Sequence, residues 1–136
     1  MAKRSGKYGS ILASLLLAGL TVSVFAVSQN RGPVSAITRY HEAITRKDAE
    51  MLEAALLQPP DHPACQALTQ YVGRLQQLNP SVRFVNEEKR GKEGQIVALY
   101  TAPTGRPLAF IPFSLDKVGG AWKVDAVTTV SILRQM

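Results

Sequence analysis

This sequence predicts an α+β domain in which three helices pack on one face of a four-stranded antiparallel meander, preceded by an N-terminal apolar helix. The first observation is the stretch 108–127, where apolar side chains alternate on both sides of a polar loop ending in Gly119-Gly120, the pattern of a β-hairpin. The second is helical periodicity over 34–78, which stops at Asn79-Pro80 and gives way to alternation. Helices followed by closely spaced strands are typical of an α+β domain.

Residues 1–27 have the pattern of a signal peptide or a signal anchor. Lys3, Arg4 and Lys7 precede Ile11–Val27, a run without charge or proline. Spanning a bilayer takes about 20 apolar residues, with about 17 as the lower limit, so a retained anchor and cleavage after Ala26 both fit. The basic residues favour a cytoplasmic N-terminus and an extracytoplasmic body, periplasmic or on the cell surface, and secreted if cleaved.

A polar linker over 28–33 separates this segment from the predicted domain, which covers 34–136. The first helix begins near Val34, and Asp48 is expected to cap a second helix over Ala49–Leu57. Proline stops that helix because it lacks the amide proton. A third helix is predicted to start around Asp61-His62-Pro63, with His62 as a capping or surface residue.

The strands are predicted over 82–89, over 95–102 and on both sides of the loop 116–120. Short loops between all four favour an antiparallel meander. The β-branched run Val127–Leu133 is expected to continue the fourth strand. One face of the last two strands should point into the core: Ala109, Ile111, Phe113, Leu115, Trp122, Val124 and Ala126.

Two segments resemble the nuclear transport factor 2-like superfamily, which has a cystatin-like α+β cone. Residues 36–49 (AITRYHEAITRKDA) look like the opening helix of that family, followed by a second helix that begins with Asp. Residues 113–124 (FSLDKVGGAWKV) are similar to its last hairpin. The resemblance covers about residues 34–132 and implies a small membrane-anchored or secreted bacterial-type member. The superfamily includes ketosteroid isomerase, dehydratases, polyketide cyclases and many non-catalytic binding modules, so it implies no single activity.

The enzyme interpretation depends on Tyr40 and His41. In this resemblance Tyr40 lies where the isomerase has its oxyanion-hole tyrosine, but that chemistry also needs a carboxylate base and a second acid in the apolar cone. Asp116 is expected in a turn and Asp125 facing outward, so the pair is missing. His41 lies in the apolar arc of the first helix, either as a general base or ligand contact, or as a core histidine bonded to a tyrosine.

The sequence therefore favours a non-catalytic extracytoplasmic binding or assembly domain, with a cone that is filled or open to a small apolar ligand. The alternatives are a small lyase or isomerase, with His41 as base and Tyr40 as hydrogen-bond donor, and a subunit of a membrane complex. The candidate cavity-lining residues are Tyr40, His41, Leu68, Tyr71, Tyr100, Phe113 and Trp122.

Both faces of the second and third strands carry apolar side chains, so a partner is expected over the far face, either a second copy or a membrane-complex subunit. The candidate interface residues are Ile96, Ala98, Leu108 and Phe110. Of the net charge of +6, three charges precede residue 8, and the rest form no clustered stripe, so no nucleic-acid partner is expected. One cysteine, Cys65, and two isolated histidines predict no disulfide within the chain, no metal and no cofactor.

Overall fold

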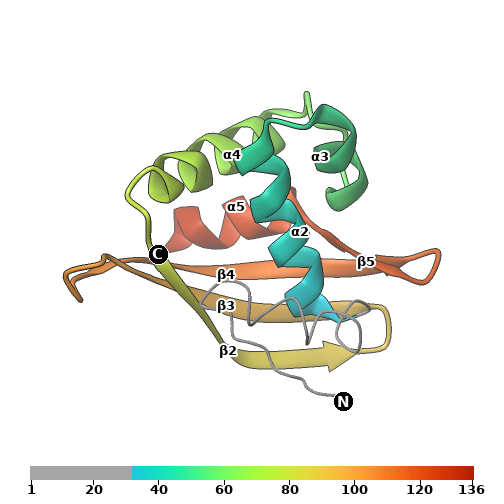
Figure 1. Cartoon of the computed structure of the whole chain (residues 1–136). Coiled ribbons are helices and arrows are strands. Elements are labelled where there is room, and N and C mark those ends of the chain that lie inside the picture. The colour runs from blue at the N-terminus through green and yellow to red at the C-terminus, as the bar shows by residue number, and fades with distance from the viewer. Residues whose placement is uncertain (1–31) are drawn as a thin grey trace, which may run out of the picture.

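The structure is a computed structural model that describes residues 32–136. Three helices come first: α2 (Pro33–Arg46), α3 (Ala49–Ala55) and α4 (Pro63–Gln76). The strands β2 (Ser81–Arg90), β3 (Glu93–Thr101), β4 (Pro107–Val118) and β5 (Ala121–Val124) follow, and α5 (Ala126–Gln135) ends the chain. Figure 1 shows the helices above one face of the sheet. The predicted α+β class with a four-stranded antiparallel sheet is confirmed, and the described residues contain four helices, α5 among them. The predicted N-terminal apolar helix lies outside the described residues.

The helix boundaries follow from local chemistry. Pro33 occupies the first turn of α2, where its missing amide proton costs nothing. The Asp48 carboxylate accepts a hydrogen bond of 3.1 Å from the Met51 amide, which confirms the predicted cap of α3. His62 caps α4, since its Nδ1 accepts from the Ala64 amide at 3.1 Å. Helix α3 ends before its predicted end at 57, because Leu56 is extended and bridges to Val124 of β5.

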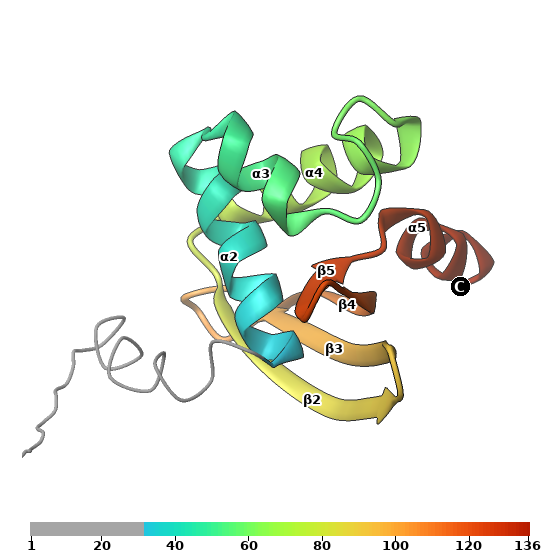
Figure 2. The same ribbon diagram turned by 90° about the vertical axis from the view of Figure 1, so that its right-hand side faces the viewer.

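The sheet has the order β2-β3-β4-β5 with antiparallel pairing throughout. Strand β4 runs on to Val118, so the turn to β5 is shorter than the predicted loop 116–120. Its two residues, Gly119 and Gly120, have φ values of 59° and 82°, and two positive φ angles in succession match the twist of a two-residue hairpin. Viewed from the side, the helices lie on one side of the curved sheet, and no described element covers the other (Figure 2).

The prediction that Val127–Leu133 continues the fourth strand is wrong, because the chain turns into helix α5 after Val124. Asp125 causes this change, since its Oδ1 accepts the Thr128 amide at 3.1 Å and its Oδ2 accepts the Thr128 hydroxyl at 2.7 Å. A helix cap and tertiary packing outweigh the weak β preference of Val and Thr.

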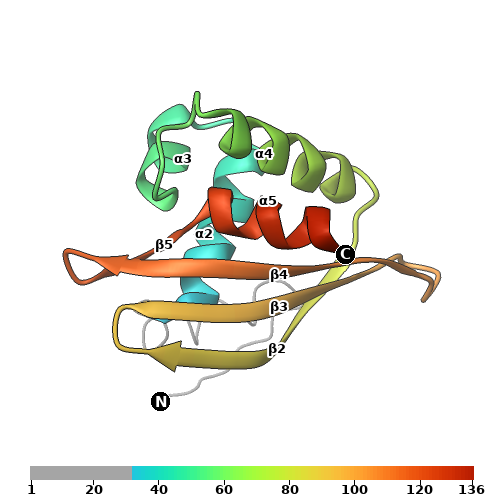
Figure 3. The same ribbon diagram turned by 180° about the vertical axis from the view of Figure 1, so that it is seen from behind.

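Helix α5 lies along the part of β4 that β5 leaves unpaired (Figure 3). The buried Thr129 hydroxyl accepts the Ser114 amide at 2.9 Å, and the Asp125 amide donates to the Ser114 carbonyl at 2.8 Å. These bonds satisfy backbone groups that an edge strand would otherwise expose.

The core fills the space between the helices and the inner face of the sheet. The predicted inward face of β4 and β5 is confirmed from Ala109 to Val124, with Ala109 partly buried and the others buried. Ala126 is also buried, but as the first residue of α5 rather than in a strand. Helices α2 and α4 contribute the facing side chains Ala36, Ile37, Tyr40, Cys65, Leu68, Val72 and Leu75.

Candidate functional site

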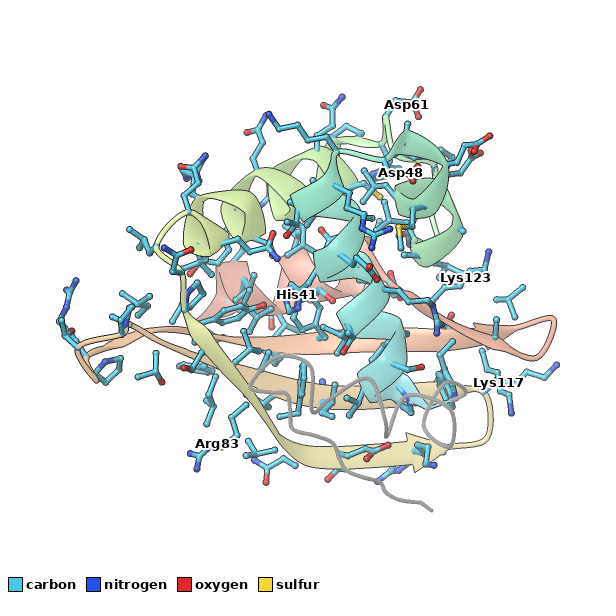
Figure 4. The ribbon with its side chains drawn as sticks, in the orientation of Figure 1. His41, Asp48, Asp61, Arg83, Lys117 and Lys123 are labelled. Carbon is cyan, nitrogen blue, oxygen red and sulfur yellow. The ribbon has the colours of Figure 1, made fainter. Side chains whose placement is uncertain are left out.

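Four of the seven candidate cavity residues meet in one aromatic cluster beneath α2. The His41 ring lies 5.7 Å from the Tyr100 ring and 6.3 Å from the Phe113 ring, with edge contacts in both cases. Tyr40 meets Phe113 edge-on at 6.2 Å. Such edge-to-face contacts are the preferred arrangement of aromatic rings. The cluster joins α2 to β3 and β4, and Figure 4 shows His41 directed from α2 toward the sheet.

Two side-chain hydrogen bonds satisfy the polar atoms of this cluster. His41 Nε2 and the Tyr100 hydroxyl are 2.7 Å apart, so Tyr100 is the tyrosine partner of this histidine. The Tyr40 hydroxyl lies 2.9 Å from Thr69 Oγ1 on α4. The backbone carbonyl of His41 accepts a further bond of 3.1 Å from Gln76 Nε2. Helix α2 is thereby fixed to both the sheet and α4 by polar contacts within an apolar layer.

The network is uncharged at neutral pH. Burial lowers the pKa of His41 from 6.5 to about 4, because a charged imidazolium would lose its hydration. Burial likewise raises the pKa of Tyr40 and of Tyr100 above the ordinary tyrosine value. A neutral histidine bonded to a protonated tyrosine needs no counter-ion, so this pair is suited to a packed interior.

The interior of the domain is filled with side chains at this point. Tyr40, Leu68, Tyr100 and Phe113 are each 1% exposed or less, and Trp122 is 5% exposed. Tyr71 is partly buried at the margin of the core. Four pockets at the surface of residues 32–136 are lined by other residues than the seven candidates. Apart from Tyr71 and His41, which are partly buried, the candidates are buried side chains that pack against one another.

The carboxylates of the last strands are placed differently from the sequence prediction, and both lie apart from His41. Asp116 belongs to β4 rather than to a turn, and it pairs in register with Lys123. Asp125 caps α5 instead of facing outward from a strand. Burial raises the pKa of Asp125, but hydrogen bonds from Gln58 and Thr128 outweigh this and lower it overall. Both carboxylates line a polar surface pocket of about 390 Å³, together with Glu88, Arg90, Glu93, Gln95, Ser114 and Thr128.

The candidate interface residues divide between the two faces of the sheet. Ile96 and Ala98 are 1% and 0% exposed and lie under the helices, so their assignment to an outer interface is wrong. Leu108 packs against the core beside a register shift between β3 and β4, so its assignment to the outer interface is also wrong. Phe110 is 50% exposed on the uncovered face.

The true outer face consists of rows that run across β2, β3 and β4. Val85, Val97 and Pro112 form one row in register, and Arg83, Leu99 and Phe110 form the next. We call these six residues the outer face. The sequence prediction missed the register between β3 and β4. Val97 pairs with Pro112, and Pro112 points to the opposite face from its neighbour Phe113, which is inward. Val97 and Pro112 therefore belong to the outer face. Figure 4 shows Arg83 pointing away from the helices.

Comparisons with known proteins add little to this description. No protein-family model matches the chain, and no curated protein matches it. One solved structure that resembles it is that of a variant of Rv3472, a function unknown protein from Mycobacterium tuberculosis. The likeness has 15% sequence identity and a TM-score of 0.41, and it covers 76% of this chain and 72% of the other. A likeness this remote carries no argument about family or function.

Two further searches apply to residues 32–136 alone. No helix in that range has the length and apolar character needed to cross a membrane. No group of three or more His, Cys, Asp or Glu side chains in the same range is arranged to hold a metal ion. The predicted signal peptide or anchor over residues 1–27 lies outside the described residues.

Proposed function

We propose that this protein is a non-catalytic assembly domain of the nuclear transport factor 2-like kind, tethered outside the cytoplasm by an apolar helix at residues 11–27. The observation that carries the proposal is the contrast between the two faces of the sheet. The inner face is closed by tightly buried side chains. On the outer face Phe110 is exposed, and the apolar residues in register with it or in the next row, Val85, Val97, Leu99 and Pro112, are only partly buried. A contiguous apolar patch on a protein surface is typical of an interaction site.

The packed inner cluster favours assembly over catalysis or ligand binding. A pocket for a small apolar ligand needs about 300 Å³ or more of space beside its lining residues. His41 Nε2 and the Tyr100 hydroxyl are instead hydrogen-bonded to each other at 2.7 Å, and neither residue lines any of the four surface pockets described above. The carboxylates that a lyase or isomerase would need lie at a separate surface pocket.

The occupant that fits the outer face is a second copy of the chain. With a two-fold axis along β3, β3 would face β3 of the second copy and β2 would face β4 of the second copy. Each row of residues would then face the same row in reverse order. Val85 would then face Pro112 of the second copy, and Arg83 would face Phe110, a favourable cation–π arrangement. Arg90 would face Asp116, because both belong to the row that contains Glu93. The Arg83–Phe110 and Arg90–Asp116 pairings favour this axis, whereas Glu93 on β3 would face Glu93 of the second copy.

The same axis suits two tethered chains. A two-fold axis along the strands keeps both copies pointing in one direction, so both N-terminal segments enter the same membrane. The support for the tether is the sequence pattern itself, with three basic residues before the uncharged run Ile11–Val27.

The mass of the full chain in detergent micelles, measured by light scattering during size-exclusion chromatography, tests the proposal. We expect a dimer that Phe110→Lys converts to a monomer, because the ammonium would face Arg83 of the second copy and place two like charges together at the interface. Leu78→Lys is the matched control, since Leu78 is 52% exposed but lies beyond the end of α4. A wild-type monomer at high micromolar concentration would sink the proposal, as would a dimer that Phe110→Lys leaves intact.

Cross-linking tests the axis itself. Leu99 lies on β3 and would meet Leu99 of the second copy, across facing sheets that lie about 10 Å apart, too far for a direct disulfide. A short bismaleimide should therefore link Leu99→Cys into a dimer in isolated membranes, and the native Cys65 is buried and does not compete. Leu78→Cys should stay monomeric with the same reagent, and equal cross-linking of both variants would count against the axis.

A further inference from the structure

We infer that the end of the domain formed by the β2–β3 and β4–β5 turns is a contact surface for anionic phospholipid headgroups. This surface, the tip surface, consists of Lys92, Lys117, Val118, Gly119, Gly120 and Lys123. The inference rests on the proposed tether, and it adds which end of the domain meets the membrane and what chemistry holds it there.

The two turns form one surface although they lie far apart in the sequence. The Lys117 amide donates a hydrogen bond of 2.7 Å to the carbonyl of Lys92, which joins the β4–β5 turn to the β2–β3 turn. Lys92 and Lys117 are exposed, and Lys123 is partly exposed. Figure 4 shows Lys117 and Lys123 directed outward at this end of the sheet.

The path of the chain brings this end toward the membrane. Figures 1 and 2 place the first turn of α2 at the same end of the sheet as both hairpin turns. The six residue steps from Val27 to Pro33 span at most about 20 Å when fully extended. Strand β4 has 12 residues, so the opposite end of the sheet lies about 40 Å further away. A tether that ends at Val27 can therefore bring only the near end to the headgroups.

The charge at the tip surface complements an anionic bilayer. Among the described residues, no carboxylate forms an ion pair with Lys92, Lys117 or Lys123. The nearby carboxylates Glu88, Glu93 and Asp116 line the polar pocket behind the turns, whereas the hollow at the tip is lined by lysines, glycines and Val118. Exposed lysines near an anionic membrane surface are attracted to it within about one Debye length, roughly 8 Å at physiological salt.

Val118 adds an apolar contact to this charge. Its side chain is 48% exposed at the end of β4, directly before the two glycines of the turn. Substituting either glycine would strain the turn, since both have positive φ angles. A single aliphatic side chain between lysines suits the boundary between headgroups and acyl chains, where the ammonium groups remain in water.

The test places an environment-sensitive fluorophore on Val118→Cys in the full chain, reconstituted into nanodiscs that contain phosphatidylglycerol or phosphatidylcholine alone. With phosphatidylglycerol we expect a blue-shifted emission that a lipid-bound quencher suppresses. The triple variant Lys92→Gln, Lys117→Gln, Lys123→Gln should reduce the ratio of membrane-bound to free tip about 100-fold, at about fivefold per lysine. The same label on Thr104→Cys, in the β3–β4 turn at the far end of the sheet, should report water throughout.

The outcomes separate this inference from the proposed tether. A chain that stays with the nanodiscs while the Val118 label reports water overturns the tip surface and leaves the tether standing. A Val118 signal that is equal in both lipids, or unchanged in the triple variant, overturns the role of the lysines. A chain that alkaline carbonate strips from native membranes overturns the tether, and the tip surface with it.

Discussion

At the scale of single residues, the contact between Gly94 and Trp122 shows how closely the sheet and its side chains are fitted. Trp122 lies over Gly94 of β3, and a Cβ atom at that position would stand 2.9 Å from Cζ3 of the indole ring. Carbon atoms in contact are normally about 3.5–4.0 Å apart, so any larger residue must displace the indole. Nζ of Lys117, a residue of the tip surface, lies 5.9 Å from the centroid of the same ring.

Gly94→Ala should therefore destabilise the domain by about 1–3 kcal/mol, as expected for overpacking in a core. Trp122 is the sole tryptophan, so its emission reports the displacement directly as a red shift. Urea unfolding of the full chain in micelles gives the stability. Gly73→Ala is the control, because its Cβ would lie 3.7 Å from Ile44, an ordinary contact, and alanine favours a helix. Similar losses in the two variants would refute the overpacking argument.

At the scale of elements, the sequence predicted most boundaries because they depend on neighbouring residues alone. Asp48, His62 and the prolines fix the helix ends by local hydrogen bonding or by its absence. Helix α5 was missed because its run of Val and Thr has β propensity, while the deciding partners are distant. Gln58 donates to Asp125 at 2.8 Å and accepts the Ala126 amide at 3.0 Å, 67 and 68 residues along the chain. The local signal was Asp125 three residues before Thr128, an N-cap pattern within an apparent strand.

Asp125→Ala tests whether this cap determines α5. The substitution removes three hydrogen bonds to the Asp125 carboxylate and leaves the Gln58 amide group without one of its partners. We expect a loss of about 2 kcal/mol, at the upper end for an N-cap, together with faster amide exchange in residues 129–133. Asp48→Ala removes one exposed cap bond of the short α3 and should cost about half as much. Equal costs, with α5 still protected from exchange, would show that packing alone holds the helix.

At the scale of the whole molecule, the members of the inner cluster could be predicted from the sequence, whereas the filling of the interior by their side chains could not. The helical arc of α2 and the alternation of β4 place Tyr40, His41 and Phe113 on one interior from the sequence alone. Whether that interior is open depends on how side-chain volumes from four elements fit together, which no local pattern encodes. The outer face likewise needed the pairing of β3 with β4, since a shift of one residue exchanges the two faces.

The partly buried His41 makes the stability of the whole domain depend on pH. The pKa of His41 is about 4 in the folded chain and 6.5 at its ordinary value, so the unfolded chain binds the proton first as the pH falls. The free energy of unfolding is therefore at its full value above about pH 6.5, and His41 lowers it by up to about 1.4 kcal/mol per pH unit down to about pH 4. Urea unfolding at pH 7.5, 6 and 5, followed by Trp122 fluorescence, measures the slope.

His41→Gln removes this titration and keeps a polar side chain near the Tyr100 hydroxyl. At pH 7.5 the variant should be about 1–2 kcal/mol less stable than the wild type, because the buried hydroxyl pairs less well. The difference in unfolding free energy between the two proteins should shrink as the pH falls. Only the wild type has a histidine at position 41 that binds a proton in the unfolded chain and so loses stability. A wild type with the same unfolding free energy at pH 7.5 and pH 5 would mean that His41 is protonated at the same pH in both states, and the neutral His41–Tyr100 pair would no longer describe the core.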